Sequence, residues 1–253
     1  MANILETKKL GIDFGGLTAV NNLSMYVDDK EIVGLIGPNG AGKTTVFNLL
    51  TKVYEPSRGE ILLDGKNTSK LNTVSINKEG IARTFQNIRL FNDLIVLDNV
   101  LTGMHNAIAY STFDSIFRLP KYYKQEKEAF EKAKELLEIF DLDRFADYKA
   151  SSLPYGAQRK LEIARALATN PKLLLLDEPA AGMNPQETEE LMNTIKFVRD
   201  KFNISILLIE HDMNLVMNIC ERIYVLNYGT LLAKGSPEEI KNNKEVIKAY
   251  LGD

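Results

Sequence analysis

Eight consecutive residues have the types and order that phosphate binding requires: Gly37-Pro38-Asn39-Gly40-Ala41-Gly42-Lys43-Thr44. Glycine has no Cβ, so backbone N–H groups can converge on phosphate oxygens, and a helix that begins near Gly42 would point its positive end at them. Lys43 would neutralise the β and γ oxygens of a nucleotide, and the Thr44 hydroxyl is placed to bind Mg²⁺. The segment, with the adjacent Thr45, therefore predicts a loop that binds nucleotide phosphates.

A second pair of candidate residues, Asp177 and Glu178, follows four leucines that are typical of a buried strand. A carboxylate at the tip of such a strand is the expected partner of the metal, so Asp177 would hold Mg²⁺ directly or through water. Glu178 would polarise the attacking water as a general base. The alternative is a strand-end aspartate that caps the next helix, which Pro179 makes plausible. The phosphate loop elsewhere in the chain favours the catalytic interpretation.

The elements around the phosphate loop are those that such a loop needs. Residues 32–36 form a short apolar run, typical of a strand buried on both faces, and this run leads through the glycines into a helix. Residues 23–27 alternate with period two before a turn signal, and 60–63 form another short strand. We expect a parallel α/β core with an antiparallel flank early in the chain.

The middle of the chain, from about 92 to 167, has helical periodicity and lacks strand signals. Afterwards the alternation resumes, with buried strands expected at 173–176 and 204–209 and a helix at 186–201 between them. The sequence thus predicts a helical insertion within an α/β domain.

The end of the chain predicts a hairpin and a last helix. Asn227-Tyr228-Gly229 separates two short β-prone runs and is typical of a hairpin turn. Ser236 is suited to cap a helix and Pro237 to occupy its first position. We expect one short C-terminal helix at 237–251.

The composition is that of an ordinary globular protein: 253 residues, 45% hydrophobic and 26% charged, with a net charge of −3. The slightly negative charge argues against a nucleic-acid partner. No apolar run has the roughly 18 residues of a membrane span, and the first residues do not have the pattern of a signal peptide. The single cysteine, Cys220, excludes a disulfide within the chain and a cysteine-based zinc site, and it favours the cytosol as the compartment.

Further motifs follow in the order found in the ATP-binding-cassette (ABC) ATPases, a family that the chain resembles over nearly its whole length. They stand at the positions of the Q-loop, the signature, the D-loop and the switch histidine: Thr84-Phe85-Gln86, Leu153-Pro154-Tyr155-Gly156-Ala157-Gln158-Arg159, Ala180-Ala181-Gly182-Met183-Asn184 and Ile209-Glu210-His211-Asp212. The resemblance implies an α/β fold of the P-loop NTPase type. Its parts would be a RecA-like parallel core, an antiparallel β flank and a helical subdomain, in ABC ATPase architecture.

The resemblance also implies roles for single residues and for cofactors. Gln86 would approach Mg²⁺ and the lytic water, and His211 would act with Glu178 in catalysis. Phe14, ahead of the first core strand, would stack on the adenine of ATP. We therefore expect ATP and Mg²⁺ as cofactors, with Thr44, Gln86 and Asp177 around the metal. The predicted organisation is a single domain over 1–253, with the helical insertion at about 88–165.

The signature departs from the family pattern. In the family, two subunits enclose two ATP molecules, and the signature of one subunit touches the γ-phosphate bound to the other. Here Pro154 replaces the usual serine and Ala157 the usual glutamine, ahead of a helix expected at 160–168. We expect contact in trans from Pro154, Tyr155, Gly156 and Ala157 through backbone N–H groups and the helix end, although proline itself has no N–H. Asn184 likewise replaces the usual D-loop aspartate.

Within the family, the chain resembles the ATPases of branched-chain amino acid importers. The similar segments are 83–91, 161–167, 178–185, an insertion around 104–125 and the C-terminal end. The resemblance implies an ATP-hydrolysing subunit that lies peripherally on the cytoplasmic face of the membrane. Its partners would be a second ABC ATPase subunit, identical or different, two transmembrane permeases and, indirectly, an extracytoplasmic amino-acid-binding protein.

Two segments are candidates for the contact with the permeases. One is 88–92, directly after the Q-loop. The other is the aromatic stretch 110–123, for which an ordinary local core is an equally weighted interpretation, because coupling surfaces and small cores both use aromatic residues.

Three other functions compete with an amino acid importer. The first is an ABC ATPase of another transport system, such as lipid or lipopolysaccharide export. The second is a soluble cassette of DNA repair or translation, which would carry a long coiled coil or tandem cassettes that this chain lacks. The third is a nucleotide-binding regulator without turnover, which an ATP hydrolysis assay would identify.

Overall fold

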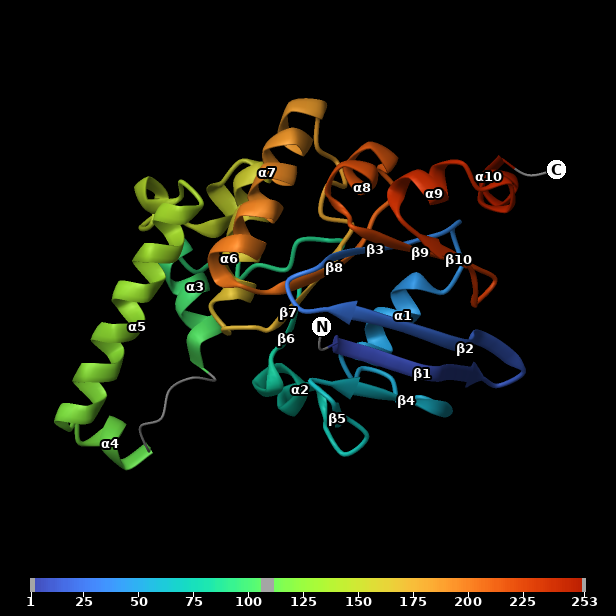
Figure 1. Ribbon diagram of the computed structural model, residues 1–253. Coiled ribbons are helices and arrows are strands. Elements are labelled where there is room, and N and C mark those ends of the chain that lie inside the picture. The colour runs from blue at the N-terminus through green and yellow to red at the C-terminus, as the bar shows by residue number, and fades with distance from the viewer. Residues whose placement is uncertain (1–2, 106–111, 252–253) are drawn as a thin grey trace. The chain divides into compact units, whose positions relative to one another are not determined.

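The structure, a computed structural model, describes residues 3–105 and 112–251 (Figure 1). It consists of two compact units. The first unit is formed by Met1–Gln86 together with Lys172–Asp253, and the second by Asn87–Pro171. The first unit carries two β-sheets and the second is helical, so the two are described separately.

The larger sheet of the first unit has six strands in the order β10-β9-β3-β8-β7-β6. Five neighbouring strands run parallel and β10 is antiparallel to β9. The strands are β3 (Ile32–Ile36), β6 (Ile81–Arg83), β7 (Leu173–Asp177), β8 (Ser205–Ile209), β9 (Arg222–Asn227) and β10 (Thr230–Gly235). Every residue of β3, β7 and β8 is buried, which explains their unbroken apolar sequences.

The smaller sheet is antiparallel and has the strand order β2-β1-β4-β5. Its strands are β1 (Asn3–Phe14), β2 (Leu17–Asp28), β4 (Arg58–Leu63) and β5 (Lys66–Asn67). The expected antiparallel flank early in the chain is therefore present, and it is completed by strands that follow the phosphate loop in sequence.

Helices of the first unit are α1 (Lys43–Leu50), α2 (Thr73–Glu79), α7 (Pro185–Phe202), α8 (Met213–Ile219), α9 (Pro237–Lys241) and α10 (Lys244–Leu251). Buried residues of α1, Val46 and Phe47 among them, share one hydrophobic cluster with strands of both sheets. The helix after the phosphate loop is thus fixed between the sheets, and so is the loop that leads into it.

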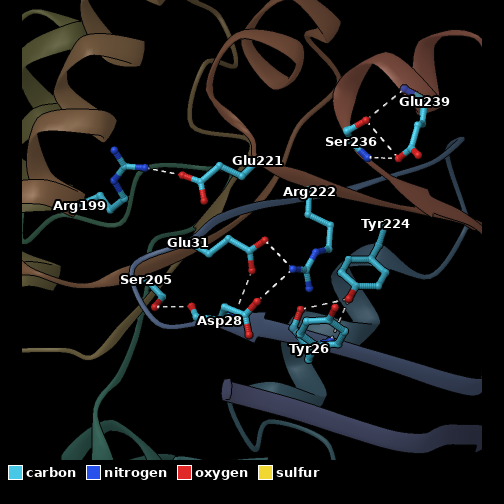
Figure 2. A network of polar contacts seen from close by, with 10 residues as sticks. All are labelled: Tyr26, Asp28, Glu31, Arg199, Ser205, Glu221, Arg222, Tyr224, Ser236 and Glu239. Atoms are coloured by element: carbon cyan, nitrogen blue, oxygen red, sulfur yellow. Dashed lines mark hydrogen bonds and ion pairs between the residues drawn. The ribbon is translucent and has the colours of Figure 1, made fainter. Parts of the chain in front are cut away.

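An ionic network also links the two sheets (Figure 2). Arg222 on β9 donates to Asp28 on β2 at 3.0 Å and lies 3.1 Å from Glu31. Tyr224 on β9 donates its hydroxyl to the carbonyl of Tyr26 at 3.2 Å. Burial raises the pKa of Glu31, while the Arg222 guanidinium opposes that rise. Two alternate residues of β9, Arg222 and Tyr224, therefore bind the antiparallel sheet.

The single C-terminal helix expected at 237–251 is two helices, α9 and α10. The prediction for its start is confirmed, because the Ser236 hydroxyl accepts from Glu239 N in a capping box and Pro237 is in the first turn. The interruption comes at Asn243, whose side-chain oxygen accepts from Glu245 N at 2.9 Å and so caps a new helix. A polar pair, Asn242-Asn243, ended the helix without any glycine or proline.

The second unit contains α3 (Val96–Met104), α4 (Thr112–Ile116), α5 (Pro120–Ile139) and α6 (Tyr155–Leu167), with 3₁₀ turns η2 (Asp143–Phe145) and η3 (Ala150–Ser152). Its helices pack around buried residues such as Val100, Leu137 and Leu161. The helix expected at 160–168 begins earlier, at Tyr155, so most of the signature forms the first turns of α6 rather than a loop. The Pro154-Tyr155-Gly156 sequence resembles a turn, but proline is well tolerated just before a helix.

None of the helices in the described ranges is both long enough and apolar enough to cross a bilayer.

Candidate ATP-binding and hydrolysis site

The phosphate loop connects β3 to α1, as its sequence context requires. Three glycines of the loop have positive φ angles: 152° at Gly37, 78° at Gly40 and 99° at Gly42. These conformations are strained for residues with a Cβ, so the glycines are needed for the course of the backbone itself. Gly42 stands at the N-cap of α1 and provides no side-chain cap, which leaves the first N–H groups of the helix directed at the loop.

Two of these glycines also allow close contact with neighbouring strands. A Cβ on Gly37 would lie 2.2 Å from the carbonyl oxygen of Leu226 on β9, and one on Gly42 would lie 2.7 Å from that of Ala19 on β2. The loop is therefore tightly fitted between two strands. The sequence pattern attributes these glycines to phosphate approach, while the structure adds a packing requirement.

Lys43 lies against the loop that it follows. Its Nζ donates to the carbonyl oxygens of Gly37 at 2.7 Å and Pro38 at 3.0 Å, and only 6% of the residue is exposed. Burial lowers the pKa of Lys43, and the charges of Glu178 and Asp177 oppose that shift. Thr44, the next residue, is exposed. A cation held among carbonyl groups with two carboxylates nearby is well placed to exchange those contacts for phosphate oxygens.

The three residues predicted to be catalytic lie together, although they come from three separate segments. Gln86 donates its side-chain amide to Glu178 Oε2 at 2.6 Å, and His211 Nε2 lies 2.7 Å from Glu178 Oε1. The Glu178 carboxylate is thus held on both oxygens. Its backbone has a φ of 46°, a left-handed conformation that glutamate rarely adopts and that often marks functional positions.

A buried glutamate that the sequence analysis did not single out organises this cluster. Glu210, 3% exposed, accepts from the backbone N–H groups of Ala180 at 2.7 Å and His211 at 2.8 Å. It therefore joins the segment after Glu178 to the segment of His211. The only signal in the sequence was an acidic residue beside a histidine at the end of an apolar strand.

Asp177 ends β7 and is 4% exposed. Its Oδ2 accepts from Arg83 Nη2 at 2.7 Å. Because β6, β7 and β3 belong to one parallel sheet, their carboxyl ends bring Arg83, Asp177 and the phosphate loop to the same edge. Arg83 is a second functional candidate that the motif analysis named only as part of a similar segment.

The donors at this edge suit ATP with Mg²⁺. The loop supplies N–H groups and a lysine for phosphates, and Thr44, Gln86 and Asp177 supply hydroxyl, amide and carboxylate oxygens, which are the ligands that Mg²⁺ prefers. Phe14, predicted to stack on adenine, is 43% exposed and packs edge-on against Tyr54 with ring centroids 5.2 Å apart. The exposed Phe14 ring is therefore available for stacking on adenine. Tyr54, which the sequence analysis did not single out, packs against its side.

The D-loop residue Asn184, which stands where the family has an aspartate, caps a helix as an aspartate would. Asn184 caps α7, accepting from Glu187 N at 3.0 Å, while Glu187 accepts from Asn184 N at 2.9 Å. Asparagine and aspartate are about equally good N-caps. The substitution therefore keeps the helix start intact.

The signature lies in the helical unit. Pro154 is the N-cap of α6 and Tyr155 is 43% exposed. Gln158 turns its amide inward to the carbonyl of Leu153 at 2.9 Å. Arg159 and Glu162 form a buried ion pair at 2.7 Å. The start of α6 thus presents an exposed Pro154 and Tyr155 and a half-buried Gly156, on a firmly packed helix.

The model of the ABC transporter family matches residues 20–181, from within β2 to the segment after Glu178. The chain belongs to the ATP-binding cassette family. This confirms the predicted family, the ABC ATPase fold and the ATPase class. A second family model, described as branched-chain amino acid ATP-binding cassette transporter, matches residues 230–253.

Relatives of this ABC ATPase align over almost the whole chain. It is 48% identical to the high-affinity branched-chain amino acid transport ATP-binding protein BraF of Pseudomonas aeruginosa, and the alignment covers 99% of the chain and 98% of BraF. It is 49% identical to LivG of Escherichia coli K12, with the same coverages. The lipopolysaccharide export ATP-binding protein LptB of Haemophilus influenzae is 33% identical over 99% of the chain and 98% of its own length.

Solved structures share the fold. The ADP conformation of an ATP-binding cassette of an ABC transporter superposes with a TM-score of 0.87 at 31% identity, covering all of both chains. A nucleotide-free cassette gives 0.86 at 33% identity, over 99% of this chain and 100% of the other. A dimeric cassette in a post-hydrolysis state with ADP and phosphate gives 0.75 at 26% identity, over 92% of this chain and 98% of the other.

Proposed function

We propose that this ABC ATPase is the ATP-hydrolysing subunit of an importer for branched-chain amino acids. The observation that carries the hydrolytic part is the Gln86–Glu178–His211 cluster beside the phosphate loop. The substrate class rests on the names of the relatives near 48–49% identity and on the family model at the C-terminus. Lipopolysaccharide export is the less supported alternative, because LptB is only 33% identical to this chain.

In the proposed mechanism Glu178 accepts a proton from the water that attacks the γ-phosphate. His211 and Gln86 hold the carboxylate in the orientation that this proton transfer needs. Both would also sense whether the γ-phosphate is bound. Lys43 leaves the loop carbonyls to neutralise phosphate charge. Mg²⁺, held by Thr44, Asp177 and Gln86, would neutralise further charge on the β and γ oxygens.

The site is proposed to be completed by a second ABC ATPase subunit. The start of α6 would face the phosphates of ATP bound by the partner, with the N–H groups near Gly156 and the positive helix end as ligands. Pro154 offers no N–H, so Tyr155, Gly156 and Ala157 would make this contact. The dimeric post-hydrolysis cassette among the similar structures supports the arrangement.

The segment after the Q-loop is suited to contact a permease. The side chain of Asn99 binds both the N–H and the carbonyl of Phe91, at 2.9 and 3.1 Å. Glu162 accepts from Arg89 N at 3.1 Å, and Arg165 donates to the Arg89 carbonyl. The backbone is thereby fixed while the Phe91 ring stays 53% exposed, as expected of an anchor for a protein partner.

The aromatic stretch 110–123 is proposed as a second contact. Tyr110 lies outside the described residues. Phe113 and Phe117 are 63% and 60% exposed with ring centroids 4.4 Å apart, and Tyr123 is 57% exposed. The sequence is equally compatible with a contact surface and with a local core. Side chains this exposed favour the contact surface. In this arrangement the subunit lies peripherally on the cytoplasmic face.

The test is ATP turnover in a complex with the permeases, comparing the wild type with Glu178→Gln. Glutamine keeps the size of the side chain but cannot accept the proton, so turnover should fall by about 10²–10⁴-fold while ATP binding persists. Equal rates would contradict Glu178 as the base. Uptake of labelled leucine into vesicles, driven by ATP only in the wild type, tests the substrate class separately, and no uptake with intact turnover would point to another cargo.

A further inference from the structure

Arg83 is a nearly buried cation that connects two parts of the ATP site. It stands at the end of β6, and its side chain is 7% exposed. Nη2 donates to Oδ2 of Asp177 at 2.7 Å, and Nη1 donates to the side-chain oxygen of Asn48 at 2.7 Å. Asn48 belongs to α1, the helix that begins at the phosphate loop. One guanidinium therefore joins the Asp177 carboxylate, the proposed metal ligand, to that helix.

The position of this guanidinium does not depend on Asp177 alone. Its central carbon lies 5.5 Å from the ring centroid of Phe47 and 5.0 Å from that of Phe85. The rings and Asn48 together restrain the guanidinium, which presents one N–H group to Asp177 from a fixed direction. Preorganised donors of this kind set the orientation of a carboxylate before its ligand arrives.

We propose that Arg83 is a positioning residue for Mg²⁺–ATP: through Oδ2 it fixes Asp177 so that the other carboxylate oxygen serves the metal, and it couples that carboxylate to α1. The inference rests on the proposed role of Asp177 as a metal partner. A fixed cation near a metal site has two opposite consequences. It repels Mg²⁺ by charge, and it favours Mg²⁺ by orienting the ligand. The short bond, the second bond to α1 and the two rings make orientation the dominant effect.

The two consequences predict opposite results for a neutral variant, so the sign of the change is decisive. The full-length chain is titrated calorimetrically with ATP, once with MgCl₂ and once with EDTA, and the ratio of the two dissociation constants measures the benefit from Mg²⁺. In Arg83→Met this benefit should fall by about tenfold, the lower range for lost outer-shell partners of metal ligands. An unchanged or larger benefit would overturn the proposal.

Two further variants separate geometry from charge and from folding. Arg83→Lys keeps the charge but cannot span Asp177 and Asn48 together, so most of the loss should remain. Asn48→Ala leaves Arg83 and its charge in place and removes only the bond to α1. It should lower the Mg²⁺ benefit in the same direction, and it keeps the question answerable if Arg83→Met does not fold. Full benefit from Mg²⁺ in both variants would overturn the proposal.

Asp177→Asn distinguishes a failure of this inference from a failure of the proposed function. If Asp177 serves the metal, the asparagine variant loses the Mg²⁺ benefit, and adding Arg83→Met to it causes no further loss. A loss in Asp177→Asn without one in Arg83→Met would refute only the role of Arg83. An unchanged benefit in Asp177→Asn would refute the metal role of Asp177 and the inference with it.

Discussion

The starts of α1 and α6 differ in how much of a phosphate site each carries. Both helices begin without a side-chain cap, at Gly42 and at Pro154. The start of α1 is enclosed by its own chain: the loop is fitted between β9 and β2, and Lys43 is folded against it. The start of α6 presents a proline, an exposed Tyr155 and Gly156, with no cation of its own in the first turn.

We infer that the start of α1 can hold the phosphates of ATP without a second subunit, whereas the start of α6 cannot. Helices α7 and α8 begin differently, because Asn184 and Asp212 cap them through side-chain oxygens. A helix end without such a cap leaves N–H groups for a ligand. In the proposed site Lys43 would add the charge that makes the start of α1 sufficient, whereas α6 would add N–H donors to phosphates that another subunit already holds.

Among the variants that compare the two helix starts, the largest effect is expected at the start of α1. In Lys43→Ala the phosphates lose their cation, and ATP affinity of the isolated chain should fall by a few hundredfold, on the order of 3–4 kcal/mol. Calorimetry measures the change. The matched variant Tyr155→Ala at the other helix should leave this affinity within about twofold, because the isolated chain would not use α6. A large loss of ATP affinity in Tyr155→Ala would contradict the idea that only the start of α1 binds ATP in the isolated chain.

A carboxylate at the start of α6 tests its proposed contact in trans. Gly156→Asp places an acid in the first turn, where it favours the helix itself but repels phosphate. Turnover of the assembled transporter should fall by about a hundredfold, with unchanged ATP binding by the isolated chain. Gly156→Asn, similar in size but neutral, serves as the control and should retain most turnover. Equal turnover in the two variants would exclude phosphate contact at this position.

The tight fit of the phosphate loop predicts a loss of stability. In Gly37→Ala the new Cβ would approach the Leu226 carbonyl to 2.2 Å at a φ of 152°, costing about 1–3 kcal/mol. Thermal unfolding should show a decrease in Tm of several degrees. Gly16→Ala, where a Cβ meets no atom within 4 Å, should leave the Tm nearly unchanged. Equal Tm values for both variants would mean that the loop relaxes freely.

The smallest effect is expected at the signature proline. Pro154 has φ −57° and ψ 153° at the N-cap of α6, angles that serine adopts easily. Pro154→Ser should therefore leave turnover within a few-fold, because the backbone donors are unchanged. The same transporter assay checks this. A loss of several hundredfold would show that the start of α6 is specialised around proline.

The motif order was sufficient to predict the loop, the buried strands beside it and the identity of the residues around Glu178. Each of these depends on local features: glycines before a helix, apolar runs, and a carboxylate at a strand end. The start of α6 was predicted five residues too late because a Pro-Tyr-Gly sequence resembles a turn. The break between α9 and α10 was missed because an asparagine cap inside a helical pattern leaves little signal.

The sequence was enough to predict a nucleotide-binding chain and the side chains proposed for hydrolysis, since glycine spacing and strand-end carboxylates are local properties. How those side chains meet depends on the tertiary structure. Gln86 reaches Glu178, 92 positions away, and Arg83 reaches Asp177, 94 positions away, because parallel strands bring their ends to one edge of the sheet. Arg83 and Glu210 acquire their importance from burial and from partners distant in sequence, and neither property is encoded in a short motif.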